Sequence, residues 1–120
     1  MKIKPFGYRD ELMRAYKNSI DRPVEYTCEV GVWRGHFSES ILNIFRSDLK
    51  AHYLVDLWAP QDCYGDDCNT TPEKFEEAIL ATQKIVDDMG LSEKARFLRG
   101  LSTEVCDSIE DSSLDFCYID

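Results

Sequence analysis

The sequence predicts an α/β domain built on a parallel sheet. Short apolar segments of strand type alternate with amphipathic helical segments, and neither repeats nor low-complexity runs interrupt the alternation. Such alternation is typical of parallel strands joined by helical crossovers that cover the sheet. The 120 residues are enough for one domain. We therefore expect a single domain over residues 1–120, with a leading helix inside residues 1–22.

The first half of the chain is predicted to contain two helices with a strand between them. From Tyr8 to about Ile20, apolar residues recur at helical spacing. Pro23 ends this helix, because proline disfavours helical geometry in the residue before it. Residues 26–30 follow as a strand that runs into a glycine turn. A second helix is predicted from His36 to Phe45, with one apolar face.

A long helix is the clearest element of the second half. Thr71 suits the N-cap, Pro72 the first helical position and Gly90 the C-terminal stop. The other predicted elements are a strand at residues 51–57, a polar loop at 58–71, a strand at 95–98, a short helix at 103–109 and a final strand within 113–120.

The final strand carries the apolar run Phe116–Ile119. A continuous apolar run is typical of a strand inside a parallel sheet, with neighbours on both sides. The sequence ends directly after it. We therefore expect a sheet that is truncated after its fourth strand. The alternative is an edge covered by another chain or a second copy, because bare apolar edges aggregate.

Composition excludes several classes of partner. Lys and Arg number 14 against 23 Asp and Glu, which gives a net charge of −9. Such a surface repels a phosphate backbone, so no nucleic acid is expected. The apolar runs fall short of the ~20 residues of a bilayer span, and the first residues lack the apolar core of a signal peptide. We expect a cytoplasmic protein without a membrane partner.

The five cysteines fit reducing surroundings. Cys28, Cys106 and Cys117 lie in stretches that are expected to be buried, where a free thiol behaves as a small hydrophobe. Cys63 and Cys68 have a spacing that allows a metal or a disulfide. No second pair of metal ligands is visible, so a plain loop is favoured.

A glycine turn follows the first strand. Gly31 and Gly35 let the chain turn tightly, and the helix after them points unpaired N–H groups at a ligand. Glu29 stands two positions before the first glycine, where it would repel a pyrophosphate. The third glycine of dinucleotide-binding turns is absent. The turn therefore favours a positively charged ligand over a nicotinamide or nucleotide-sugar cofactor.

Three further candidates follow the other strands. Asp56 ends the second strand, and its two oxygens suit the hydroxyls of a ribose. Ser102 follows a glycine after the third strand, although a serine there is equally suited to cap the short helix. Asp120 ends the fourth strand. Open parallel sheets bind their ligands at the carboxyl ends of the strands.

Four segments in this order resemble class I S-adenosylmethionine-dependent methyltransferases, and above all their small bacterial and phage-type members. They are Glu29-Val-Gly-Val-Trp-Arg-Gly35, Leu54-Val-Asp-Leu-Trp58, Arg99-Gly-Leu-Ser102 and Leu114-Asp-Phe-Cys-Tyr-Ile-Asp120. The resemblance implies a three-layer Rossmann-like sheet with helices on both faces. It covers about residues 26–120, and the later strands and substrate pocket of a complete member are missing from it.

The resemblance also implies a role for each residue. Gly31 and Gly35 would surround the methionine part of the cofactor, and Glu29 would support the loop and the cofactor's amino group. Asp56 would hold the ribose, Leu57 and Trp58 would lie against the adenine, and Ser102 would approach the adenine amino group. Asp120 would face the methyl-transfer centre or ligate a divalent ion. Packing in the core is an equally weighted reading of Trp58.

Two functions are compatible with these observations. The first is a methyltransferase, or its cofactor-binding half, that acts on a small molecule or a sugar-like hydroxyl. The second is a non-catalytic module that binds a nucleoside or pairs its sheet edge with another chain. His36 and His52 lack the Ser or Cys and acid partners that nucleophilic catalysis needs.

Overall fold

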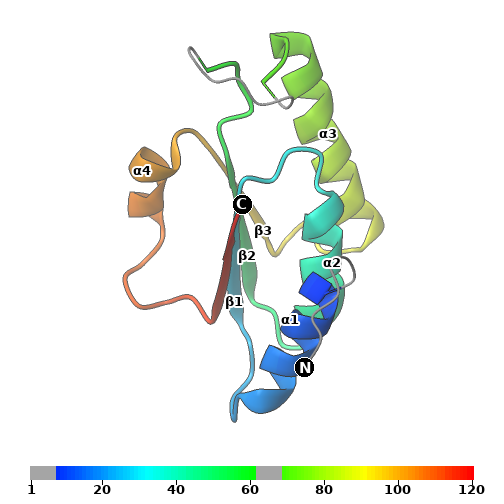
Figure 1. Ribbon diagram of the computed structural model, residues 1–120, viewed down its shortest axis with the longest axis vertical. Coiled ribbons are helices and arrows are strands. Elements are labelled where there is room, and N and C mark those ends of the chain that lie inside the picture. Colours follow the sequence, from blue (N-terminus) through cyan, green and yellow to red (C-terminus); the bar gives the residue numbers. More distant parts are fainter. Residues whose placement is uncertain (1–7, 62–68) are drawn as a thin grey trace.

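The computed structural model describes residues 8–61 and 69–120, which form a four-stranded parallel sheet with helices packed on it (Figure 1). The elements are α1 (Tyr8–Ser19), β1 (Tyr26–Val30), α2 (His36–Phe45), β2 (Ala51–Asp56), α3 (Pro72–Asp88), β3 (Ala95–Arg99), α4 (Ser102–Val105), the 3-10 helix η1 (Cys106–Ser108) and β4 (Phe116–Ile119). The strand order is β3-β2-β1-β4.

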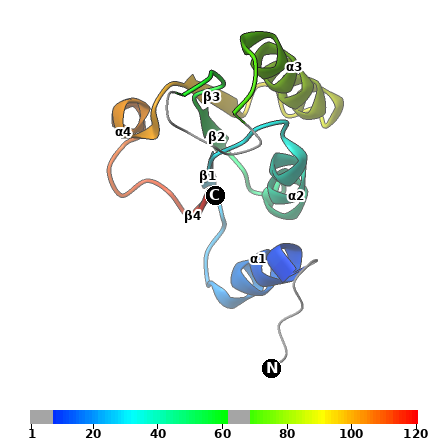
Figure 2. The same ribbon diagram turned by 45° about the horizontal axis from the view of Figure 1, so that its top comes forward.

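The helices lie on both faces of the sheet. Figure 2 shows α1, α2 and α3 on one side and the short α4 on the other. The chain therefore has the predicted three-layer α/β architecture. The predicted short helix proves to be one turn of α-helix, α4, followed by η1. In the described residues the outer edge of β4 has no neighbouring strand, because β4 pairs only with β1.

Helix α3 forms where its end signals predict it. The Thr71 hydroxyl accepts a hydrogen bond from the Lys74 amide at 3.3 Å, and Pro72 occupies the first position of the helix. Gly90 follows the helix with a φ of 72°, which is the left-handed conformation that glycine adopts readily. Buried residues on α3, Phe75 and Ala78 among them, pack against Leu54 of β2.

The opposite face of the sheet is more open. Cys28 of β1 is buried, but Cys106 and Cys117 are exposed, contrary to the prediction that all three are buried. Ile119 is 74% exposed. Only Phe116 and Tyr118 of β4 turn toward the packed side, where they contact α1 and α2. The reason is that the short α4 covers less of the sheet than the three helices on the other face.

Candidate functional site

The carboxyl ends of the four strands are joined into one edge by main-chain hydrogen bonds. The Asp120 amide donates to the Val30 carbonyl at 2.9 Å, and the Gly31 amide donates to the Val55 carbonyl at 2.8 Å. At the other side, the Gly100 amide donates to the carbonyl of Asp56 at 3.0 Å. The residues predicted after each strand therefore come together at one edge.

A cleft of about 400 Å³ opens along this edge. Five of the residues predicted to bind the cofactor or act in catalysis line it, namely Gly31, Asp56, Leu57, Ser102 and Asp120. The other three, Glu29, Gly35 and Trp58, are buried behind the cleft. The predicted site residues therefore divide into those that can contact a ligand in the cleft and those that pack behind its lining.

Gly31 is needed for the close approach of β1 and β4. Its φ is 90°, and a Cβ at this position would lie 3.2 Å from the Cβ of Asp120. A side chain here would push the end of β4 away or fill the cleft. The sequence predicted Gly31 for a tight turn, and the packing of the turn against the end of β4 is an additional reason for a glycine here.

A glycine is required at position 35 for a different structural reason. Its φ is 85°, and a Cβ there would lie 2.9 Å from both the Cγ2 and the Oγ1 of Thr82 on α3. This glycine lets the start of α2 pack closely on α3. Gly35 is buried against α3, and its predicted contact with the methionine part of a cofactor stays a prediction.

Asp56 holds the walls of the cleft together. Its Oδ2 accepts hydrogen bonds from the amides of Val32 at 2.8 Å and Trp33 at 2.9 Å, and its Oδ1 accepts one from the amide of Trp58 at 2.9 Å. A carboxylate offers about four acceptor positions. Three of them are used within the chain, which leaves about one on Oδ1 for a ligand.

Glu29 is a buried carboxyl beneath the glycine turn. It is 1% exposed and accepts a hydrogen bond from the Ser38 hydroxyl of α2. Burial raises its pKa to about 7, the Ser38 hydrogen bond opposes that rise, and the charges of Asp120 and Asp56 add to it. The carboxyl groups of Glu29, Asp56 and Asp120 therefore lie close enough to interact electrostatically. A cation in the cleft would relieve the repulsion between their negative charges.

Trp58 belongs to the hydrophobic core. Its side chain is 0% exposed, and its Nε1 donates to the carbonyl of Trp33 at 2.9 Å. Its ring has no free face for an adenine, so the core reading is the one that fits. Trp33 lines the cleft instead. Nothing in the residue spacing singled out Trp33, because its position depends on a left-handed backbone with a φ of 57°.

Comparison with solved structures finds the same architecture, whereas comparison by sequence finds no match. No protein-family model matches the sequence, and no curated protein matches it significantly. Among solved structures, the chain is similar to the SAH-bound methyltransferase PaMTH1 of Podospora anserina, with a TM-score of 0.64 and 13% sequence identity. The likeness covers 98% of this chain and 42% of that one.

The chain therefore shares its fold with a solved methyltransferase. At 13% identity the likeness concerns the fold alone. This methyltransferase-like fold places Ser102 as the first residue of α4, exposed and without a side-chain cap role, since Leu101 precedes the helix. The N-cap reading of Ser102 is therefore not supported. Asp120 is exposed at the end of β4.

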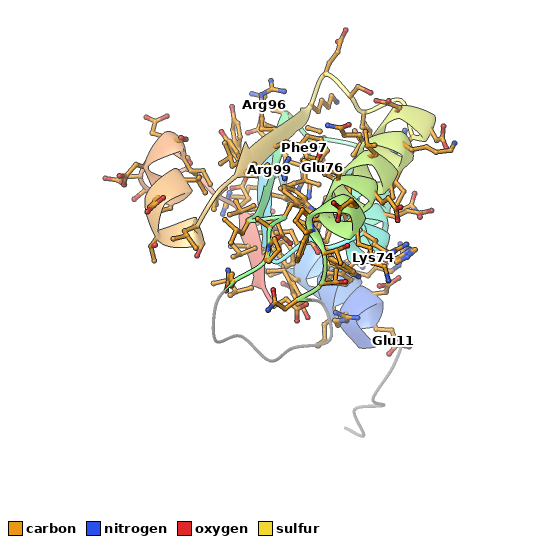
Figure 3. All side chains as sticks on the ribbon, turned by 90° about the horizontal axis from the view of Figure 1, so that it is seen from above. Glu11, Lys74, Glu76, Arg96, Phe97 and Arg99 are labelled. Carbon is orange, nitrogen blue, oxygen red and sulfur yellow. The ribbon has the colours of Figure 1, made fainter. Side chains whose placement is uncertain are left out.

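An exposed ion pair joins the end of β3 to α3. Figure 3 shows Arg99, at the end of β3, close to Glu76 on α3, and their side chains are 2.5 Å apart. Arg99 also donates to the carbonyl of Trp58 at 2.9 Å. Sequence reasoning missed this contact, because β3 and α3 come together only in the fold.

Within residues 8–61 and 69–120, no group of three or more His, Cys, Asp or Glu side chains is arranged to hold a metal ion. No helix in those ranges is long and apolar enough to cross a bilayer. Cys63 and Cys68 lie outside the described residues.

Proposed function

We propose that this chain is the S-adenosylmethionine-binding part of a methyltransferase that acts on a small molecule or a sugar-like hydroxyl. One observation carries the proposal. Gly31, Asp56 and Asp120 stand at the carboxyl ends of three different strands and line one cleft. These ends are where open parallel sheets bind ligands.

The charge of the cleft supports a cationic ligand. Asp56 and Asp120 line it, and the Glu29 carboxyl lies buried behind it. A sulfonium carries a positive charge, whereas a pyrophosphate would meet repulsion from all three groups. The net charge of −9 likewise favours a small acceptor over a nucleic acid.

The chain's own residues would hold and orient such a ligand. The Gly31 backbone leaves room beside Asp120. The remaining acceptor position of Asp56 would bind a ribose hydroxyl, and Leu57 and Ser102 line the cleft where the adenine would lie. When bound, S-adenosylmethionine supplies an activated methyl group. Asp120 is the residue of this set that we assign to the transfer centre, because its Cβ lies beside Gly31.

Calorimetry with S-adenosylmethionine and S-adenosylhomocysteine tests the proposal. Gly31→Val should abolish binding of both, because the new side chain fills the space beside Asp120. Gly90→Val is the matched control. It carries the same positive-φ cost, but a Cβ there meets nothing within 4 Å.

Failure of the wild-type chain to bind either compound would contradict the proposal. So would unchanged binding by Gly31→Val. Binding by the longest natural form of the protein, with no methyl transfer to any hydroxyl acceptor, would favour the alternative of a non-catalytic nucleoside-binding module.

A further inference from the structure

Two tryptophans with left-handed backbone conformations flank Asp56. Trp33 has a φ of 57° and Trp58 a φ of 46°. Large side chains rarely adopt positive φ, and such residues persist only where the surrounding contacts hold them in place. Both tryptophans lie at the carboxyl edge of the sheet, one in the β1–α2 turn and the other just after β2.

The Asp56 carboxylate links the two turns. Its Oδ2 accepts from the amide of Trp33 and its Oδ1 from the amide of Trp58, each at 2.9 Å. Oδ2 also accepts from the Val32 amide at 2.8 Å. Charge-assisted hydrogen bonds of this kind are about twice as strong as neutral ones. One side chain thus holds both unusual backbone conformations.

Trp33 is fixed from other directions as well. Its carbonyl accepts a hydrogen bond from the Trp58 Nε1 at 2.9 Å. It also lies 3.3 Å from the Thr82 hydroxyl, whose single proton it shares with the Ala78 carbonyl at 2.9 Å. Its ring meets Phe75 edge to face, with centroids 5.4 Å apart. Trp33 and Phe75 both line the cleft, and Trp33 is only half-buried. The indole is therefore held in one orientation at the wall of the cleft.

We propose that Trp33 forms the aromatic wall of the ligand cleft, and that Asp56 is a positioning residue that acts on the ligand by holding the Trp33 turn. This inference rests on the proposed function for the identity of the ligand. It assigns the main effect of Asp56 to the turn, and only a minor effect to a ribose contact.

A pair of nucleosides separates the two roles of Asp56. The probes are 5′-methylthioadenosine and its 2′-deoxy analogue, titrated into the wild type and Asp56→Asn. Asparagine keeps the size of the side chain but places an NH₂ group against backbone donors. If Asp56 acts through the turn, both ligands should lose affinity by the same factor, about tenfold. A loss confined to the ribo ligand would overturn the inference.

Tryptophan fluorescence gives a readout without any ligand. The chain has two tryptophans, and both belong to this network. Asp56→Asn should shift the emission of the free protein to longer wavelength, because a released Trp33 ring gains contact with water. An unchanged spectrum would overturn the positioning role. This measurement needs no ligand. It therefore tests the positioning role even if the wild type binds neither S-adenosylmethionine nor S-adenosylhomocysteine, the result that would contradict the proposed function.

Further variants guard against misfolding. If Asp56→Asn does not fold, Thr82→Val removes one hydrogen bond to the Trp33 carbonyl while nearly keeping the side-chain shape, and the same red shift is expected. Trp33→Ala should weaken the binding of both nucleosides, and Trp33→Phe should keep most of the wild-type affinity. The exposed Leu80→Ala is the control. Wild-type affinity in Trp33→Ala would overturn the assignment of the aromatic wall.

Discussion

At the scale of single residues, two buried titratable side chains bind protons differently in the folded and unfolded states. The pKa of Glu29 is raised to about 7 by burial, and the pKa of His52 is lowered to about 3 by burial. His52 lies 2.7 Å from the Thr27 hydroxyl through Nδ1, and its Nε2 has no hydrogen-bond partner among the described residues. Each residue makes the free energy of unfolding depend on pH, and the two dependences have opposite signs.

Glu29→Gln should remove a loss of stability that the wild type shows as pH rises from about 4.5 to about 7. The unfolded carboxyl has a pKa near 4.5 and the folded one about 7, so the folded state binds more protons between those values. Stability is therefore highest below pH 4.5 with respect to this group, and it falls by about 3 kcal/mol as pH rises to 7. Denaturant unfolding of both proteins from pH 4 to 8 measures the difference.

The effect of His52 must be separated from that of Glu29. Its folded pKa lies below the ordinary value of 6.5, so the unfolded state binds more protons and stability falls as pH drops from 6.5 to 3. This contribution is the same in the wild type and in Glu29→Gln, and it cancels in their difference. Parallel pH profiles of the two proteins would contradict the assignment to Glu29.

At the scale of elements, the cleft depends on how closely α2 and α3 pack. The start of α2 approaches α3 at Gly35, where a Cβ would meet the side chain of Thr82. The Thr82 hydroxyl lies 2.9 Å from the Ala78 carbonyl and 3.3 Å from the Trp33 carbonyl, and these two acceptors share its single proton. One contact between two helices therefore also sets the position of the glycine turn.

Gly35→Ala should destabilise the fold by about 1–3 kcal/mol, because the added methyl group overpacks a buried contact in a left-handed conformation. Combining it with Thr82→Ala should recover part of that loss, since the two nearest atoms are removed. Gly90→Ala is the control for conformation alone. Denaturant unfolding of the four proteins of the cycle measures the coupling, and strictly additive losses would refute the contact.

At the scale of the whole molecule, helices cover one face of the sheet more completely than the other. In the part of the chain that the structure describes, α1, α2 and α3 pack on one face, and the short α4 with η1 after it lies on the other (Figures 1 and 2). Cys28 and Cys117 are register partners on β1 and β4. Cys28 is 2% exposed, whereas Cys117 is exposed. Burial, together with the nearby Cys117, raises the pKa of Cys28 to about 12.

Alkylation of the native protein should therefore distinguish these neighbouring thiols. Iodoacetamide at pH 8 is expected to modify Cys117 and Cys106 and to spare Cys28, since the thiolate is the reactive form and Cys28 is both buried and protonated. Mass spectrometry of peptides locates the label, and the unfolded protein, in which all three react, is the control. Equal rates for Cys28 and Cys117 would contradict the described packing.

The order of elements and the candidate edge could be predicted from the sequence. The apolar spacing of α1 and α2, and the end signals Thr71, Pro72 and Gly90 of α3, are local properties of the chain. Parallel strands end at the same edge, so Gly31, Asp56, Ser102 and Asp120 were expected together, and they line one cleft.

Only the tertiary structure decided what several of those residues do. The spacing of Trp33 and Trp58 does not reveal which ring is buried, because that depends on the left-handed turns and on the packing of α3 against them. Gly35 contacts Thr82, which is 47 residues away in the sequence. Local patterns determine which elements form. Contacts between distant segments determine which side chains face the cleft, since each such contact depends on how the elements pack.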